Sequence, residues 1–186
     1  MPRNSKSKKK EKPSKQETIK RDWINTACII SFLYDVAGRA EDAYYISWDR
    51  IKRHENGMVT AFLQSGKSPS SRTCTLSPRT VKLLDQLEAG KKNLTDKIFG
   101  FNSAKSLVMN LDRKVNKLEL PEGSAIKKYK WQSHNIRVSR ITNMRKADYT
   151  YEKIMLVSGH KSLDSLQKYM KNDEEEMQQE MHALFV

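Results

Sequence analysis

The sequence predicts an α+β domain that is mainly α-helical and carries one small three-stranded antiparallel sheet. Three observations lead to this prediction. Apolar residues recur at helical spacing along most of the chain. The Asn56-Gly57 pair, a strong hairpin signal, lies between two β-prone segments in the N-terminal third. The 186 residues are 37% hydrophobic, which is enough for one modest core.

The first helix is predicted over residues 19–36, where apolar side chains follow the helical period. Gly38 interrupts this pattern, and Arg39–Tyr45 restarts it as a short second helix. Residues 1–18 are rich in lysine and precede the first apolar stripe, so we expect a basic disordered tail there. The apolar stripe of the first helix consists of Trp23, Ala27, Ile30, Leu33 and Tyr34.

The sheet is predicted from three short segments. Tyr44–Ile51 is β-prone and precedes the hairpin signal, and Met58–Leu63 follows it. Residues 64–72 form a polar turn region with glycine and proline. Arg72–Leu76 then predicts the third strand. Each segment is short, as strands of a small antiparallel sheet usually are.

The chain is predicted to be helical after Ser77, which is a typical N-cap residue and is followed by Pro78 in the first turn. Residues 90–102 and 117–131 lack a regular apolar period and are predicted as loops. The predicted helices in this part of the chain are Thr80–Leu87, Ser103–Val115, Ser133–Arg145, Tyr149–Val157, Leu163–Met170 and Glu174–Phe185.

The positive charge belongs to the body of the chain rather than to its tail. The formal net charge is +13. Residues 1–20 carry a net +6 and residues 172–186 a net −5, which leaves +12 on the residues between them. Because such a surface gains affinity by releasing counterions from a polyanion, double-stranded DNA is the expected partner.

Several classes of protein are excluded by what the sequence lacks. No uninterrupted apolar run is longer than the four residues of Ala27–Ile30, whereas a membrane helix needs about 20. No apolar stretch follows the lysine-rich N-terminus, so no secretory signal is predicted. Cys28 and Cys74 cannot form a disulfide framework, and they favour a reducing compartment. We therefore expect an intracellular protein, located wherever its target DNA is.

Metal-dependent and nucleotide-dependent chemistry is not predicted either. The four histidines show no short metal-ligand spacing, and no acidic cluster lies beside any of them. The sequence has no P-loop, no G-x-G-x-x-G motif and no G-x-S-x-G motif. We expect no metal and no cofactor. The histidines are His54, His134, His160 and His182.

The remaining candidates for a site are cationic and protonatable residues near the ends of predicted elements. His134 and Arg137 are three residues apart, so they share one face of a helix. Taken singly, each candidate has an ordinary structural explanation: a helix start, a solvated turn, an exposed polar pair, a helix cap or a core aromatic residue. The candidates are Arg39, Lys67, His134, Arg137, His160 and Tyr169.

The order and spacing of these residues resemble the catalytic domain of tyrosine recombinases, the phage-integrase family. Gly38–Asp42 resembles the first arginine motif of that family, and Ser133–Arg137 resembles its H-x-x-R box. Val157–His160 resembles the L-G-H box, and Tyr169 follows it at the usual nine-residue distance. The resemblance covers residues 22–172 and implies the tyrosine recombinase catalytic-domain fold.

The sequence departs from the family pattern at three positions. Serine replaces the usual leucine before Gly159, Val138 follows Arg137 where a second basic residue is common, and Asp42 stands in place of glutamate. None of these changes removes a catalytic group. Family members usually carry an upstream helical domain that closes around DNA, but only 22 residues precede Trp23. Either this is an excised catalytic domain, or the protein acts without that clamp.

The resemblance implies a site-specific DNA recombinase or integrase that cleaves and rejoins DNA through a 3′-phosphotyrosyl intermediate. The chemistry needs neither a metal nor a nucleotide, because the bond energy is kept in the ester. A phosphodiester is anionic, so its transfer needs fixed positive charge on the non-bridging oxygens. The implied roles are nucleophile for Tyr169, base for His134, phosphate clamp for Arg39 and Arg137, phosphate hydrogen bond for His160 and general acid for Lys67.

Three other functions remain open from the sequence. A type IB topoisomerase uses the same local chemistry without strand exchange. A metal-independent nuclease could use His134 and His160 as acid and base, without a covalent step. A basic DNA-binding module with a decayed site is the third, although all six family positions hold residues that can perform the chemistry.

The last segment, residues 173–186, is predicted to be an acidic amphipathic helix. Asp173–Glu176 places negative charge at the helix start, where the helix dipole favours it. The acids would repel DNA, so the apolar face should contact protein. It either folds back on its own domain or, as the resemblance implies, docks on a neighbouring subunit of a dimer or tetramer on DNA. Its apolar stripe is Met177, Met181, Leu184 and Phe185.

Overall fold

Helix α1 (Lys15–Asp35) lies at the centre of the domain in the computed structural model, which describes residues 14–64, 71–88, 90, 93–119, 121–122 and 131–169. Lys67 and the segment 173–186 lie outside the described residues. The other elements, in chain order, are α2 (Ala40–Tyr45), the 3₁₀ helix η1 (Trp48–Arg50), β1 (Ile51–Arg53), β2 (Val59–Gln64), β3 (Ser71–Thr75), α3 (Pro78–Glu88), α4 (Ala104–Val115), α6 (His134–Lys146), α7 (Tyr151–Ser158) and α8 (Leu163–Gln167).

Helix α1 begins four residues earlier than its apolar period predicts. Ser14 and Glu17 form a capping box: the Ser14 backbone N–H donates to the Glu17 carboxylate at 2.8 Å, and the Glu17 N–H donates to Ser14 Oγ at 3.2 Å. The prediction of a disordered tail over residues 1–18 is therefore wrong for Lys15–Thr18, which are helical. Residues 1–13 lie outside the described residues.

The three strands form one antiparallel sheet in the order β1-β2-β3, as predicted. The turn between β1 and β2 contains Asn56 and Gly57, and Gly57 has φ +80°, which favours glycine. The prediction of a strand over Tyr44–Ile51 is wrong. That segment contains the end of α2 and η1, and its consecutive residues Ile46, Ser47 and Trp48 are all buried, whereas a half-buried strand would bury every second residue.

The start of α3 is joined to the end of α1 by a buried polar network. The Ser77 backbone N–H donates to the Asp35 carboxylate at 2.8 Å, and Thr80 Oγ1 donates to the same oxygen at 2.6 Å. Ser77 Oγ accepts from the Thr80 backbone N–H at 3.3 Å, so Ser77 caps α3 as the sequence predicts. This network fixes where β3 ends and α3 begins.

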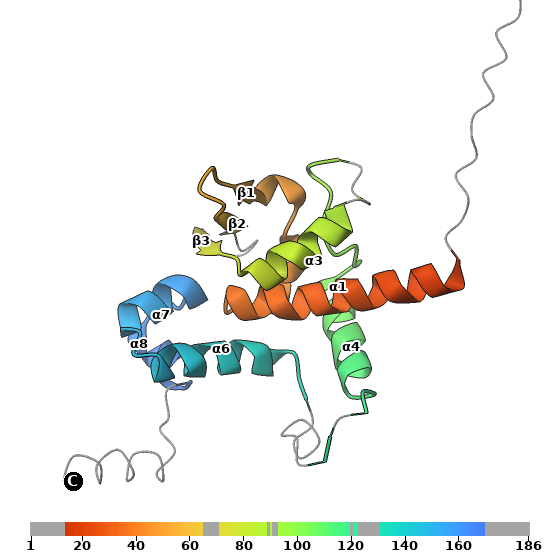
Figure 1. Cartoon of the computed structure of the whole chain (residues 1–186). Coiled ribbons are helices and arrows are strands. Elements are labelled where there is room, and N and C mark those ends of the chain that lie inside the picture. Colours follow the sequence, from red (N-terminus) through yellow and green to blue (C-terminus); the bar gives the residue numbers. More distant parts are fainter. Residues whose placement is uncertain are drawn as a thin grey trace, which may run out of the picture.

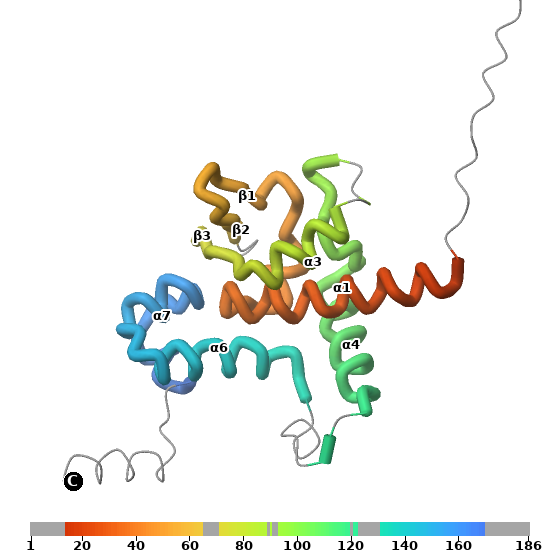
Figure 2. The backbone as a smooth tube through the Cα atoms, in the orientation of Figure 1, coloured from red at the N-terminus to blue at the C-terminus, as the bar shows by residue number. Residues whose placement is uncertain are grey.

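Among the described residues, apolar side chains form two cores. The larger core joins α1, α2, the sheet, α3 and α4, and includes Phe32, Trp48 and Leu107. The smaller core joins α6, α7 and α8 to the end of α1. The sheet and α3 lie on one side of α1 and α6 on the other, while α7 lies beyond the C-terminal end of α1 (Figures 1 and 2). The smaller core consists of Ala37, Ile141, Met144, Ile154 and Leu166.

Both cysteines are free and buried. Burial and the nearby Asp35 carboxylate raise the pKa of Cys28 to about 12. Burial also raises the pKa of Cys74, whose thiol donates a weak hydrogen bond to the Val157 carbonyl at 3.6 Å and so links β3 to α7. Within the described ranges, no helix is long and apolar enough to cross a bilayer.

Candidate active site

Arg137 is the centre of the candidate site. It lies one turn after His134 at the start of α6 and is fully buried. Its Nη1 donates to the backbone carbonyls of Ala37 and Ser158, the latter at 2.8 Å. Its Nη2 contacts His160 Nε2 at 3.0 Å. Arg137 thus ties the end of α1 and the end of α7 to α6.

The positive charge of Arg137 is poorly compensated. Its hydrogen-bond partners among the described residues are two carbonyls and an imidazole, and its Nε has no partner. Burial first, and then the nearby Arg39 charge, lower the pKa of Arg137 to about 10. A buried cation held only by neutral groups is costly, and an incoming anion would relieve that cost. The site is therefore suited to an anionic ligand.

The turn after α7 brings a further arginine into the site, which the sequence analysis missed. Gly159 ends α7 with φ +71°, and a Cβ placed there would lie 2.8 Å from Nη1 of Arg72 on β3. Glycine is therefore required for its backbone conformation and for this close approach. Arg72 has no local sequence signal, because it reads as an ordinary strand residue.

Arg72 is held by Asp42 on α2. Arg72 Nη2 lies 3.0 Å from the Asp42 carboxylate, and both side chains are mostly buried. The same carboxylate oxygen accepts the Arg39 backbone N–H at 2.7 Å at the start of α2. Asp42 thus fixes the backbone of Arg39 and the side chain of Arg72 together. The aspartate that replaces the usual glutamate keeps a carboxylate at this position.

His160 lies directly between Arg137 and the end of α7. Its Nδ1 is 2.7 Å from Ser158 Oγ, and its Nε2 is 3.0 Å from Arg137 Nη2. The side chain is buried. Burial, and then the charges of Arg137 and Arg39, lower the pKa of His160 to about 4, so the ring is neutral at pH 7.

Tyr169 follows α8 and faces both histidines. Its Oη lies 3.2 Å from His134 Nε2, and its ring centroid is 5.7 Å from that of His134 and 5.2 Å from that of His160. Burial, and then the charges of Arg137 and Arg39, lower the pKa of His134 as well. A neutral imidazole within hydrogen-bond distance of a phenol can accept its proton.

The structure joins four of the six sequence-predicted residues by direct contacts: His134, Arg137, His160 and Tyr169. Arg39 begins α2 nearby, and its charge contributes to the lowered pKa values of His134, Arg137 and His160. The sixth residue, Lys67, lies outside the described residues. The cluster combines a phenol, a neutral base and guanidinium groups, and this set can attack and hold an anionic ester.

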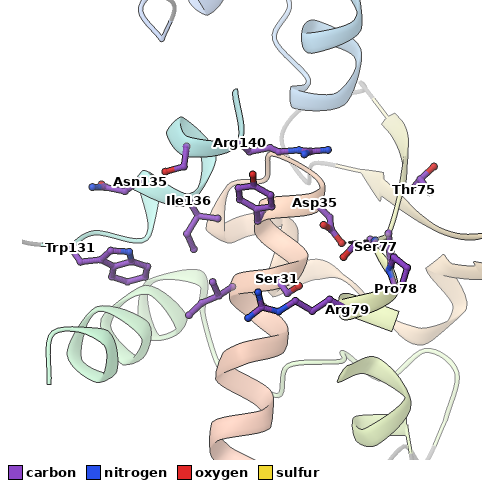
Figure 3. Close-up of a pocket in the computed structure, with 14 residues that line it drawn as sticks. Ser31, Asp35, Thr75, Ser77, Pro78, Arg79, Trp131, Asn135, Ile136 and Arg140 are labelled. Atoms are coloured by element: carbon purple, nitrogen blue, oxygen red, sulfur yellow. Dashed lines mark hydrogen bonds between the residues drawn. The ribbon is translucent and has the colours of Figure 1, made fainter. Parts of the chain in front are cut away.

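A cavity of about 1090 Å³ lies beside this cluster but does not contain it. It opens between α1, the start of α3 and α6 (Figure 3). Asn135 and Arg140 on α6 line it, whereas His134 and Arg137 on the same helix belong to the cluster. Helix α6 therefore contributes different residues to the cavity and to the cluster.

Comparison with known proteins identifies a family for this chain and structures with a similar fold. The model of the phage integrase family matches residues 10–176. No curated protein matches the sequence. Solved structures with a similar fold include XerA recombinase, with a TM-score of 0.68 and 18% identity over 100% of this chain and 67% of that one. XerH site-specific recombinase bound to a palindromic difH substrate has a TM-score of 0.69 and 17% identity over 95% of this chain and 48% of that one.

Lambda integrase, crystallised as a dimer on a core site, has a TM-score of 0.57 and 15% identity over 92% of this chain and 63% of that one. The chain therefore spans between about half and two thirds of the length of these proteins. At 15–18% identity, the similarity to these structures shows a common fold. The family is shown by the family model, which matches most of the chain. The chain belongs to the phage integrase family, and its fold is that of the tyrosine recombinase catalytic domain.

Proposed function

We propose that this chain is the catalytic domain of a site-specific DNA recombinase that cleaves and rejoins DNA through a 3′-phosphotyrosyl intermediate. One observation carries the proposal: Tyr169 Oη lies 3.2 Å from His134 Nε2, in the cluster that contains Arg137, whose buried Nε has no partner among the described residues. A nucleophile, a neutral base and a site for an anion thus meet at one point. They come from α6, the end of α7 and the turn after α8.

The cleavage step uses these groups in order. His134 accepts the phenolic proton while Tyr169 Oη attacks the phosphorus and forms a new P–O bond. The bond from phosphorus to the 5′ oxygen breaks, and that oxygen takes a proton from Lys67. For rejoining, a 5′ hydroxyl of the partner strand gives its proton to Lys67 and attacks the phosphotyrosine. The bond from phosphorus to Tyr169 Oη breaks, and Tyr169 regains its proton from His134. The number of phosphodiester bonds is conserved, so no nucleotide is consumed.

Charge stabilisation comes from the arginines. Arg39 and Arg137 are proposed to bind the non-bridging oxygens, where negative charge is spread in the transition state. Each preorganised donor of this kind contributes on the order of 3 kcal/mol. His160 is proposed to belong to the same phosphate site. The buried Arg137 needs little rearrangement, because Ala37 and Ser158 already fix its guanidinium.

The proposed partners are double-stranded DNA and further copies of the chain. The net +12 on residues 21–171 supports DNA binding. XerH was solved bound to its difH substrate, lambda integrase as a dimer bound to a core site, and the Tn1549 transposon integrase in complex with a circular intermediate DNA. We propose the catalytic unit to be residues 19–172, with residues 173–186 docking on a second copy. Deleting residues 173–186 should leave DNA binding intact and reduce assembly, as sizing on DNA would measure.

A DNA suicide substrate followed by a denaturing gel tests the proposal. The wild-type chain should form a covalent adduct. Tyr169→Phe should form none and keep its DNA affinity within about twofold, because one hydroxyl contributes little to a charge-driven interface. Tyr151→Phe is the matched control, since Tyr151 is half exposed at the start of α7, and it should form the adduct.

The other functions give different products in this experiment. A cleaved strand without an adduct would indicate a nuclease and contradict the proposal. An adduct with relaxation of supercoiled DNA, but without strand exchange between two substrates, would indicate a topoisomerase. Binding without cleavage would indicate a DNA-binding module.

A further inference from the structure

Arg72 on β3 points towards the end of α7. Alternate residues of a strand share one face, so Arg72 lies on the same face of β3 as Cys74. The Cys74 thiol contacts the Val157 carbonyl at 3.6 Å. Two residues away on each segment, the Arg72 guanidinium lies against Gly159, where a Cβ would come within 2.8 Å of its Nη1. The packing of β3 beside the end of α7 therefore directs this side chain into the site.

The same guanidinium contacts a second segment of the site through Asp42. Nη2 of Arg72 lies 3.0 Å from Oδ2 of Asp42, and the two side chains are only 13% and 9% exposed. This oxygen also accepts the backbone N–H of Arg39 at 2.7 Å. Arg39 is the N-cap residue of α2 and Asp42 is the third residue of that helix, so the bond fixes the backbone from which the Arg39 side chain leaves.

The planar guanidinium allows one side chain to contact both segments. Its Nη2 bonds Asp42, while its Nη1 covers Gly159, directly before His160. A lysine has one compact ammonium group and cannot occupy both positions. Without Arg72, the mostly buried Asp42 carboxylate would lose the cation that compensates its charge, which is costly. We expect the carboxylate then to turn towards solvent and to release the Arg39 N–H.

We propose that Arg72 is a positioning residue that, through Asp42, holds the backbone of Arg39 in place beside the turn that ends α7. Arg72 does not bind the phosphate itself, because its guanidinium is mostly buried and already paired with a carboxylate. It is nevertheless close to the site, since its charge contributes to the lowered pKa values of Arg137 and His160. The consequence for cleavage rests on the proposed function, whereas the effect on the Arg39 backbone does not.

Hydrogen exchange of the Arg39 backbone amide, followed by NMR, tests the positioning without DNA. In Arg72→Ala this amide should exchange about tenfold faster than in the wild type, because it loses its fixed acceptor. The amide of Ile29, which is buried in α1, should be accelerated much less. An equal acceleration of both amides would show a general loss of stability and would overturn the proposal.

Arg53→Ala is the matched control. Arg53 is an arginine of the same sheet, on β1, and it is paired with two carboxylates of α3 rather than with the site. Its removal should leave both the exchange of the Arg39 amide and the rate of adduct formation at their wild-type values.

The consequence for cleavage is measured on the suicide substrate, which accumulates adduct even in slow variants. Arg72→Ala should lower the rate about tenfold at a DNA affinity within about twofold of the wild type, the expected size of losing one positioning hydrogen bond. Arg72→Lys should recover only part of that rate. In an Arg39→Ala background, Arg72→Ala should have little further effect, because residues that act through one another are not additive.

Two results on DNA would overturn the proposal: a wild-type rate in Arg72→Ala, or an equal loss from this substitution with and without Arg39. A wild-type exchange rate of the Arg39 amide in Arg72→Ala would also overturn it. A wild-type chain that forms no adduct would refute the proposed function, while the exchange measurement would still decide whether Arg72 holds the Arg39 backbone.

Discussion

Two buried charged residues, Asp35 and Arg137, lie in different regions of the molecule and differ in the hydrogen-bond partners that compensate their charge. Asp35, in the region of the larger core, accepts hydrogen bonds from the Ser77 backbone at 2.8 Å and from Thr80 at 2.6 Å. Arg137, beside the smaller core, is held by two carbonyls and a neutral imidazole, and its Nε has no partner in the part of the chain that the structure describes. Each is nearly or fully inaccessible to solvent.

This is the difference expected between a charged residue with a structural role, Asp35, and one with the proposed role in binding phosphate, Arg137. Asp35 is satisfied by donors that the fold itself fixes at the start of α3, so it needs no ligand. Arg137 keeps a charge that its neighbours do not neutralise, because neutral partners orient the guanidinium without cancelling its attraction for an anion. Arg72 is intermediate, since it lies in the same site but is paired with Asp42.

The largest expected effect is on catalysis at Arg137. Arg137→Lys keeps the charge but loses the planar fork that holds the Ala37 and Ser158 carbonyls and His160. We expect adduct formation on the suicide substrate to slow by about 100-fold or more. Arg39→Lys should behave in the same way. A Lys variant at either position with a near wild-type rate would exclude a bidentate phosphate clamp there.

At Asp35 the expected effect is on stability instead. Asp35→Ala leaves the Ser77 N–H and the Thr80 hydroxyl without their common acceptor. We expect the free energy of unfolding to fall by about 2 kcal/mol. Chemical denaturation measures this, and folded variant protein should form the adduct at the wild-type rate. A loss of cleavage without a loss of stability would show that Asp35 belongs to the active site.

Lowering the pH should reduce the free energy of unfolding through His160, which contacts Arg137. The pKa of His160 is lowered to about 4 in the folded state, whereas an unfolded histidine titrates near about 6.5. Between these values the unfolded state binds more protons, so the free energy of unfolding should fall as the pH is lowered from about 6.5 to about 4. Denaturation at several pH values measures this slope, which should be shallower in His160→Gln. An equal slope in that variant would contradict the role of His160.

The smallest expected effect is the response to inorganic phosphate. An anion that binds only the folded state stabilises it by about 0.4 kcal/mol at a concentration equal to its Kd. The measurement is the increase in Tm caused by phosphate minus the increase caused by chloride at equal ionic strength. This difference should be positive and similar for the wild-type protein and for Asp35→Ala, and smaller for Arg137→Lys. Equal gains in all three proteins would place the anion elsewhere.

Local signals in the sequence predicted much of this fold. Ser77 and Pro78 mark the start of α3, and Asn56-Gly57 marks the hairpin, because a cap and a positive φ are decided within a few residues. The start of α1 was also readable from the Ser14-x-x-Glu17 capping pattern, although the apolar period alone places it four residues late. The strand predicted at Tyr44–Ile51 failed because burial in the larger core overrides β propensity.

The site could be predicted only where residues lie close in the sequence or match the family motifs. His134 and Arg137 share one face of α6 through their spacing alone. Arg72 could not be found in this way, because its partner Asp42 lies 30 residues earlier and on a different element. The burial of Arg137 could not be predicted from the sequence either, because it results from the packing of α6 against the ends of α1 and α7.

The burial of both thiols makes this chain convenient for site-specific labelling. The raised pKa values of Cys28 and Cys74 leave little reactive thiolate at neutral pH, and neither side chain is accessible to a reagent. A maleimide dye should therefore react selectively with a single cysteine introduced on the surface, for example at Leu156, which is 71% exposed on α7. Fluorescence from that position could follow the approach of DNA or of a second copy without removing either native cysteine.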